Sequence, residues 1–68
     1  MSDPIYKKIE IVGTSANSFS DAVANGIAKA AESVHGISWF EVTEQRGSVA
    51  EGKIRQFQVT INVGFKVD

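Results

Sequence analysis

The residues best suited to chemistry in this chain are aromatic and amide side chains that could hold a flat heterocyclic ligand. Trp39 is the only tryptophan, and it lies in a segment, residues 37–46, that alternates like a half-buried strand. Because successive strand side chains take opposite faces, Phe40 and Val42 point one way and Trp39 points the other. Its expected neighbours on that face are polar: Glu41, Thr43 and Gln45. Three interpretations are open: the ring enters the core through a bulge or register shift, packs on another subunit, or stacks a ligand.

Gln58 is expected on the same face of the sheet as Trp39. Its amide carries both a donor and an acceptor, so it can pair with a carbonyl and a ring nitrogen on the edge of a heterocycle. The alternative is a solvated strand glutamine. A hairpin turning near residues 49–50 places Gln58 opposite about Thr43, several residues from Trp39. The two side chains are therefore expected to meet across a subunit boundary rather than within one chain.

Arg46 and Lys66 are candidate contacts for a phosphate or another anionic tail, with solvated or ion-paired side chains as the alternative. In regular alternation Arg46 points away from Trp39, so it needs the strand end to twist, whereas Lys66 has the correct parity.

Catalytic and metal-binding groups are not expected. The chain has no cysteine and one histidine, His35, which is expected at the surface near a helix end. One histidine cannot form a zinc site alone, and the nearby Ser33 and Glu32 lack the arrangement of a catalytic triad. The sequence therefore predicts a protein that is not an enzyme and holds no metal.

Length and charge narrow the class of protein. The 68 residues form one domain, 1–68, and a chain of about this size buries only about 60% of its unfolded surface. Without disulfides, oligomerisation is the expected support. The net charge of −1 argues against a nucleic-acid partner. No apolar run reaches the roughly 18 residues of a membrane span, and no signal peptide is recognisable, so a cytoplasmic protein is expected.

The pattern of apolar residues predicts an α+β fold. Strands are expected over residues 6–12, 37–46 and 53–67, and a helix over 19–34 that Ser18 caps. Residues 47–52 are expected to form a hairpin loop. Gly26 in the helix indicates a close approach by a neighbouring element. The order strand-helix-strand-strand, with the long third strand central, predicts a three-stranded antiparallel sheet wrapped around one helix.

The chain resembles the dodecins, small flavin-binding proteins. The resemblance rests on Tyr-Lys-Lys-Ile-Glu-Ile-Val-Gly-Thr-Ser (Tyr6–Ser15) and on Ser-Phe-Ser-Asp-Ala-Val at the helix start. It continues through Ser-Trp-Phe-Glu-Val-Thr-Glu-Gln-Arg-Gly (Ser38–Gly47) and Phe-Gln-Val-Thr-Ile-Asn-Val-Gly-Phe (Phe57–Phe65). It implies a hollow sphere of twelve identical subunits, in which flavins bind as antiparallel pairs at two-fold interfaces between tryptophans of two subunits.

The resemblance also implies roles for particular residues. Trp39 falls on the stacking tryptophan and Gln58 on the glutamine that hydrogen-bonds the isoalloxazine. Arg46 and Lys66 fall on positions that are basic in some bacterial members and lie near the flavin phosphate or tail. A lysine at position 66 cannot make the bidentate fork of an arginine. Some members hold coenzyme A at other interfaces, where Lys7 is a candidate contact.

Flavin storage and buffering is therefore the expected function, with FMN as the ligand and riboflavin or lumichrome as alternatives. The competing hypothesis is a ligand-free oligomeric interaction module in which Trp39 is an interface anchor.

Overall fold

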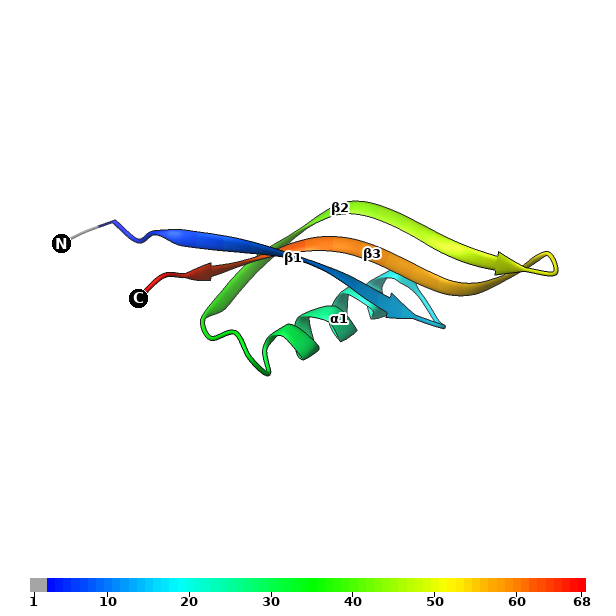
Figure 1. The fold of residues 1–68 in the computed structure, drawn as a ribbon, viewed down its shortest axis with the longest axis horizontal. Coiled ribbons are helices and arrows are strands. Elements are labelled where there is room, and N and C mark those ends of the chain that lie inside the picture. Colours follow the sequence, from blue (N-terminus) through cyan, green and yellow to red (C-terminus); the bar gives the residue numbers. More distant parts are fainter. Residues whose placement is uncertain (1–2) are drawn as a thin grey trace.

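The chain forms a three-stranded sheet with one helix packed on one side (Figure 1). The computed structural model describes residues 3–68. Its elements follow in the order β1 (Tyr6–Ser15), α1 (Phe19–Ala30), β2 (Ile37–Ala50) and β3 (Lys53–Lys66). The sheet order is β1-β3-β2, and β3 is antiparallel to both neighbours. The predicted α+β fold and strand order are confirmed. No helix among the described residues is long and apolar enough to cross a membrane.

Helix α1 begins where the sequence predicts. The Ser18 hydroxyl accepts a hydrogen bond from the Asp21 amide at 3.0 Å, which satisfies one of the unpaired donors of the first turn. The end is earlier than predicted: α1 stops at Ala30, not at Val34. The Glu32 amide donates to the Lys29 carbonyl at 3.2 Å, a tighter i to i+3 bond that turns the chain toward β2.

Two glycines let α1 lie against β1. A Cβ added to Gly13 would overlap the carbonyl oxygen of Ala22, and a Cβ added to Gly26 would lie 3.3 Å from the Cα of Gly13. The close approach predicted from Gly26 is confirmed, and its partner is the backbone of β1.

Replacing Gly13 by alanine should destabilise the fold by about 1–3 kcal/mol, the usual cost of overpacking. The added methyl group meets helix backbone, which cannot move aside without lifting α1 from the sheet. Denaturant unfolding measures the change. Ala24→Ser on the exposed side of α1 is the matched control and should cost less than about 0.7 kcal/mol. A Gly13→Ala variant as stable as this control would show that the close approach does not limit stability.

β1 and β2 are longer than the sequence predicts, whereas β3 ends at Lys66, one residue before its predicted end. β1 extends to Ser15, beyond the predicted end at residue 12, and β2 extends to Ala50, beyond the predicted end at residue 46. The predicted loop over residues 47–52 is wrong, because only Glu51 and Gly52 connect the two strands. Their φ values are +54° and +75°, as a tight two-residue hairpin with two left-handed central residues requires.

Irregular pairing in β2 changes which side chains share a face. The register with β3 shifts between Ile37 and Trp39, between Val42 and Glu44, and between Ser48 and Val49. Each extra residue moves the residues that follow onto the other face of the sheet. The shift after Val42 overturns the prediction that Gln45 shares a face with Trp39, since Gln45 pairs with the buried Val59.

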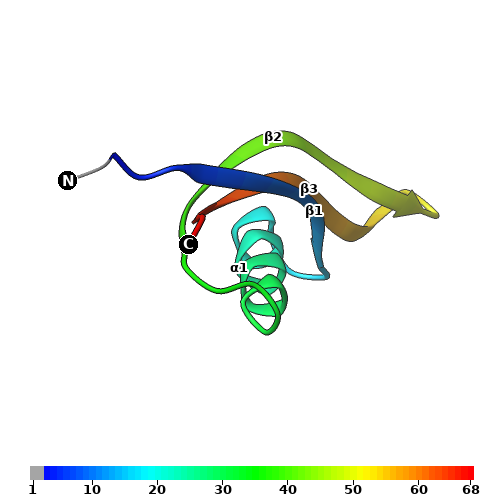
Figure 2. The same cartoon turned by 60° about the vertical axis from the view of Figure 1, so that its left-hand side comes forward.

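The core is small and covers only part of the sheet. Its fully buried members are Ala22, Val59, Ile61 and Val63. α1 packs mainly on β1 and β3, and the strands arch over it in Figure 2. On β2, Phe40 pairs with Val63 and Val42 pairs with Ile61, yet they remain 49% and 43% exposed. The apolar face of the sheet thus continues beyond the helix without cover.

The chain is elongated for its length. Its radius of gyration is 14.2 Å and its extents are 57 × 21 × 13 Å, whereas a compact domain of this length has a radius of gyration of about 11 Å. Beyond the end of β1 only the β2–β3 hairpin continues (Figure 1). This shape leaves apolar side chains for which one chain offers no cover.

Candidate functional site

The side of the sheet opposite α1 is called the open face, and it carries the sequence-predicted binding residues. Strand register places these residues on it: Tyr6, Lys8, Glu10, Val12 and Thr14 from β1, Trp39, Glu41, Glu44, Arg46 and Ser48 from β2, and Gln56, Gln58, Thr60, Asn62, Gly64 and Lys66 from β3. Trp39, Gln58, Arg46 and Lys66 therefore all lie on one surface. Most of that surface can make hydrogen bonds, and the indole is its largest apolar group.

Trp39 lies across the backbone of the central strand. It is opposite Gly64, and a Cβ added to Gly64 would overlap Cε2 and Cζ2 of the indole. The Tyr6 ring stands almost at right angles to the indole, with centroids 6.4 Å apart and an interplanar angle of 71°. Trp39 is only partly buried. The ring is thus held on the open face and does not enter the core.

Charged side chains flank Trp39. Lys8 Nζ lies 2.7 Å from Glu41 Oε1, and the Asn62 amide donates to the same oxygen at 3.5 Å. Both ion-pair partners are about half exposed, so their attraction is worth at most about 1 kcal/mol. Lys66 pairs with Tyr6 at the end of the sheet and forms no ion pair with any of residues 3–68. It is therefore a cation available to a ligand near the indole.

Gln58 and Arg46 form a second group of polar side chains. They are direct cross-strand partners, so the expectation that Gln58 lies opposite Thr43 is wrong. The bulge after Val42 also turns Arg46 onto the face of Trp39, where regular alternation would have pointed it away.

Hydrogen bonds hold both of these side chains in place. One guanidinium nitrogen of Arg46, Nη2, donates to Glu44 Oε1 at 2.9 Å and to Thr60 Oγ1 at 2.7 Å. The Gln58 amide nitrogen donates to Gln56 Oε1 at 2.8 Å. Guanidinium donors on the other two nitrogens and the carbonyl oxygen of Gln58 remain for a ligand.

One chain does not bring these two groups together. Gly64, opposite Trp39, lies six positions from Gln58 along β3. At about 3.3 Å per residue this separation is roughly 20 Å. Trp39, Tyr6 and Lys66 therefore mark one end of the open face, and Gln58 with Arg46 marks the other.

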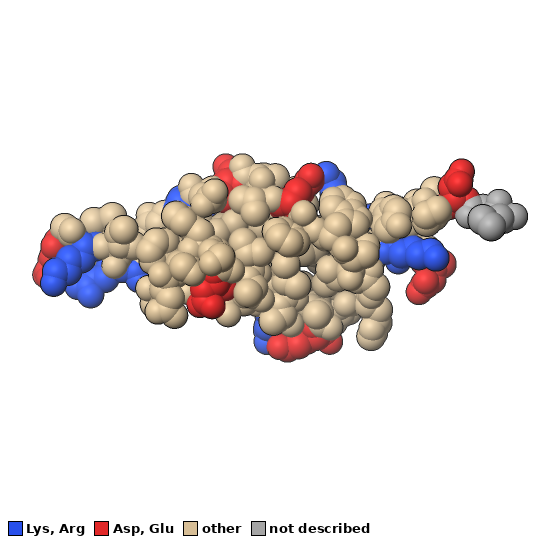
Figure 3. All heavy atoms as spheres, turned by 180° about the vertical axis from the view of Figure 1, so that it is seen from behind, with Lys and Arg blue, Asp and Glu red and all other residues tan. Residues whose placement is uncertain are grey.

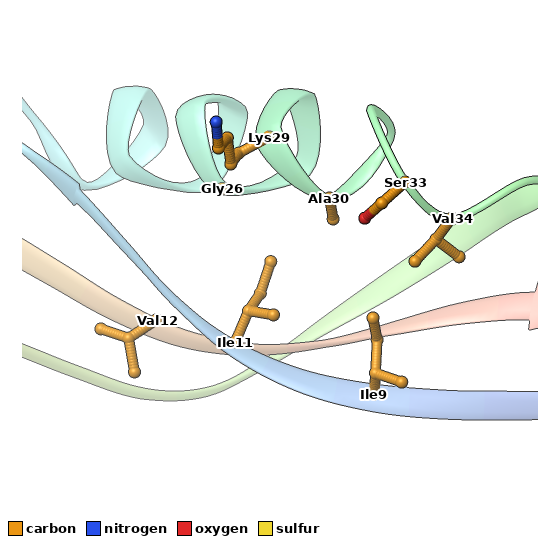
Figure 4. Close-up of a pocket in the computed structure, with 8 residues that line it drawn as sticks. All are labelled: Ile9, Ile11, Val12, Gly26, Lys29, Ala30, Ser33 and Val34. Atoms are coloured by element: carbon orange, nitrogen blue, oxygen red, sulfur yellow. The ribbon is translucent and has the colours of Figure 1, made fainter.

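Other surfaces offer less. An apolar groove of about 280 Å³ lies between α1 and β1, with Ile9, Ile11, Ala30 and Val34 among its lining (Figure 4). It is on the helix side, away from Trp39. In Figure 3, Lys and Arg gather most densely at the end formed by the β2–β3 hairpin, and uncharged atoms cover most of the middle. No group of three or more His, Cys, Asp or Glu side chains suited to a metal ion occurs among residues 3–68.

Sequence reasoning missed two neighbours of the indole, Tyr6 and Gly64. A glycine in the interior of a long strand is an available signal, since it often marks a close approach by another group. Tyr6 has the parity of the open face, but its distance from Trp39 depends on the register of two strand pairs.

These features define the class: an α+β fold whose open sheet face carries the only tryptophan of the sequence and two separated groups of polar side chains. The chain belongs to the dodecin family, since the family model described as Dodecin matches residues 5–68. A protein of Thermus thermophilus named dodecin is 38% identical over 64 residues, which cover 94% of this chain and 93% of the relative. Family membership indicates a homo-oligomer.

Solved structures of dodecins have the same fold. A structure described as dodecin from Streptomyces davaonensis has a TM-score of 0.94 at 43% identity and covers 98% of both chains. A protein of Mycobacterium tuberculosis named calcium dodecin is 38% identical over 64 residues, 93% of this chain and 89% of the relative. The family therefore includes a member named for a metal ion.

Proposed function

We propose that this protein binds and stores a flavin, with FMN as the principal ligand, at a site that two chains build together on their open faces. The observation that supports this most is the position of Trp39. Its indole lies against β3 with one side while the ring remains only partly buried on a polar surface. That arrangement offers a flat aromatic platform to a ring stacked from outside.

The separation of the two polar groups supports a shared site. In a two-fold interface each surface meets the same surface of its partner, so residue i contacts residue j and the reverse. Two open faces placed antiparallel would bring the Trp39 end of one chain over the Gln58 end of the other. The indole of one chain and the paired amide and guanidinium of the other would then surround one ligand, although the indole and that pair lie roughly 20 Å apart within a single chain. By the same two-fold symmetry, the pairing would build a second, identical site for a second ligand.

The polar groups suit a flavin with a phosphate. The Gln58 amide can face the donor and acceptor edge of the isoalloxazine, which resembles a pyrimidine. Arg46 is oriented through one nitrogen by Glu44 and Thr60, which leaves other donors for a phosphate oxygen. Lys66 is a second cation at the other end of the face. These residues support FMN over riboflavin or lumichrome.

Storage without turnover follows from the same chemistry. An indole in van der Waals contact with an excited flavin can donate an electron and quench it, which would suppress light-driven and stray redox reactions. We propose a hollow dodecamer as the storage form, located in the cytoplasm, with no enzymatic activity. A separate coenzyme A site that includes Lys7 is also proposed, and Lys7 lies on the helix side of the sheet, opposite Phe65.

A fluorescence titration tests the function. Purified protein should quench FMN as it binds, and riboflavin and lumichrome, added in parallel, measure the preference for a phosphate. If no flavin is quenched while the assembly is intact, the protein is better described as a ligand-free interaction module. In that case Trp39→Ala should dissociate the oligomer.

Arg46→Met should weaken FMN binding by about 1.5–3 kcal/mol, the usual worth of a hydrogen bond to a charged group. Riboflavin has no phosphate, so its affinity should change little. Paired titrations with the two flavins measure the difference. Lys53→Met, in the β2–β3 hairpin, controls for the lost positive charge. Equal losses for both flavins would remove Arg46 from the phosphate site.

A further inference from the structure

Gly64 is an unusual residue for its place in the sheet. It lies near the end of the central strand, is buried, and has neighbours on both sides. A glycine inside a strand gives up side-chain packing and adds chain entropy to the unfolded state. Its compensation is visible in the geometry: a Cβ would overlap Cδ2, Cε2 and Cζ2 of Trp39. The benzene half of the indole occupies the space that any side chain here would fill.

The pairing that creates this contact depends on a register shift. β2 shifts between Ile37 and Trp39, and the shift places Trp39 directly opposite Gly64. An aromatic ring laid over a cross-strand glycine covers the exposed backbone and offsets the glycine's cost. Trp39 therefore contributes to the β2–β3 pairing even without a ligand.

Tyr6 holds the indole from a third strand. Tyr6 is on β1, where it pairs with Lys66 of β3. The planes of its ring and the indole form an angle of 71°, and their centroids are 6.4 Å apart. Edge-to-face pairs of this kind are favourable beyond the apolar area that they bury. The indole thus packs against the backbone of β3 on one ring face and against the Tyr6 ring of β1 at its side.

We propose that Gly64 and Tyr6 are positioning residues that fix the plane of Trp39, and that the proposed flavin site depends on this fixed plane. Only one part of this inference, the flavin as the ligand, rests on the proposed function. Gly64 lets the indole lie flat on the backbone, so one ring face is used within the chain and the other is presented outward. Tyr6 limits sliding toward the edge of the sheet. Because stacking needs parallel rings, a tilted indole loses most of the contact with a planar ligand.

Gly64→Ala is the direct test, because its methyl group cannot share space with the indole. FMN titration should show affinity reduced at least about tenfold, or about 1.4 kcal/mol, with the near-ultraviolet circular dichroism of Trp39 altered. Tyr6→Leu, which keeps apolar bulk and removes the ring, is the second variant. It should change the same spectral band and weaken FMN less than Gly64→Ala does.

Gly64→Ala is also made in a protein that already carries Trp39→Ala. This double variant shows whether Gly64 is needed to position the indole or is needed by the strand itself. If Gly64 serves the indole, Gly64→Ala lowers the unfolding midpoint in the wild-type background and has no such effect when Trp39 is already alanine. Equal losses in both backgrounds would overturn the proposal, as would an unchanged tryptophan spectrum in Gly64→Ala.

These measurements keep the two proposals apart. The unfolding cycle and the spectra are recorded without flavin, so they decide whether Gly64 and Tyr6 position the indole. If the wild-type protein binds no flavin, the proposed function fails while the cycle still confirms or overturns the positioning. If Gly64→Ala tilts the ring yet binds FMN as tightly as wild type, the dependence of the site on the ring plane is overturned.

Discussion

Replacing Trp39 by alanine should weaken FMN binding by about 1–3 kcal/mol, the range measured for removal of one stacking aromatic. The indole is the largest apolar surface on the open face, and Gly64 beneath it offers no side chain to take its place. Flavin that still binds should lose its quenching, because the electron donor is gone. Isothermal calorimetry measures the affinity, and flavin emission measures the quenching.

Trp39→Phe is the matched control, because a phenyl ring still covers Gly64 and still offers a stacking surface. Binding should fall less than in the alanine variant, while emission should rise because phenylalanine is a poor electron donor. This pair separates ligand stacking from the contribution of Trp39 to the β2–β3 pairing. An alanine variant that binds FMN with wild-type affinity would remove Trp39 from the site.

The architecture is largely predictable from two patterns in the sequence. The alternation of apolar residues from Phe57 to Val67 identifies a long strand with one buried face, and Val59, Ile61 and Val63 are indeed fully buried. The Ser18 cap and the apolar stripe that follows identify the helix. Both signals are local and repeat over many residues, so a single misplaced residue does not change them.

The faces of β2 are not predictable in the same way. A bulge adds one residue without any distinct sequence signature, yet it inverts the face of every residue that follows. Arg46 lies beside Gln58 on the open face only because the register shifts after Val42. The arginine side chain itself suggests an anion site. The face on which Arg46 lies, however, depends on a bulge that is set by the pairing of β2 with β3.

The candidate site likewise has one part that the sequence predicts and another that depends on strand register. Trp39 and Gln58 could be assigned to one face of the sheet from the alternation of strand residues alone. The prediction that they do not meet within one chain agrees with their positions at opposite ends of the open face. The contact between Trp39 and Gly64 requires knowledge of which residues face each other across two strands. Sequence patterns indicate faces, but cross-strand neighbours follow from register.

Part of the sheet's helix side is not covered by α1. This uncovered apolar surface indicates that the fold needs assembly with another chain to be stable. Phe40 and Val42 pair with fully buried residues of β3 and continue the core outward, but α1 does not reach them. Leaving two such side chains in water forgoes apolar burial worth about 25 cal/mol per Å². A second copy of the chain is the partner that family membership indicates, and covering this surface would complete a core that one chain leaves open.

Phe40→Glu should therefore dissociate the oligomer and lower the thermal unfolding midpoint. Removing a central aromatic anchor from an interface costs about 2 kcal/mol or more, and a carboxylate buried there without a partner adds a desolvation penalty. Light scattering at micromolar concentration reports the assembly, with the expected change from a large particle to single chains.

Ala28→Glu, on the exposed side of α1, introduces the same charge where the helix tolerates glutamate well, and should leave the assembly intact. Because Phe40 faces away from Trp39, a loss of FMN binding in Phe40→Glu would arise from dissociation alone. Flavin affinity would then fall in parallel with the fraction of assembled protein as concentration is lowered, which is the behaviour of a site built from two chains. A Phe40→Glu variant that remains fully assembled would show that this face is not an interface. A dissociated variant that still binds FMN at wild-type affinity would show that one chain suffices for the site.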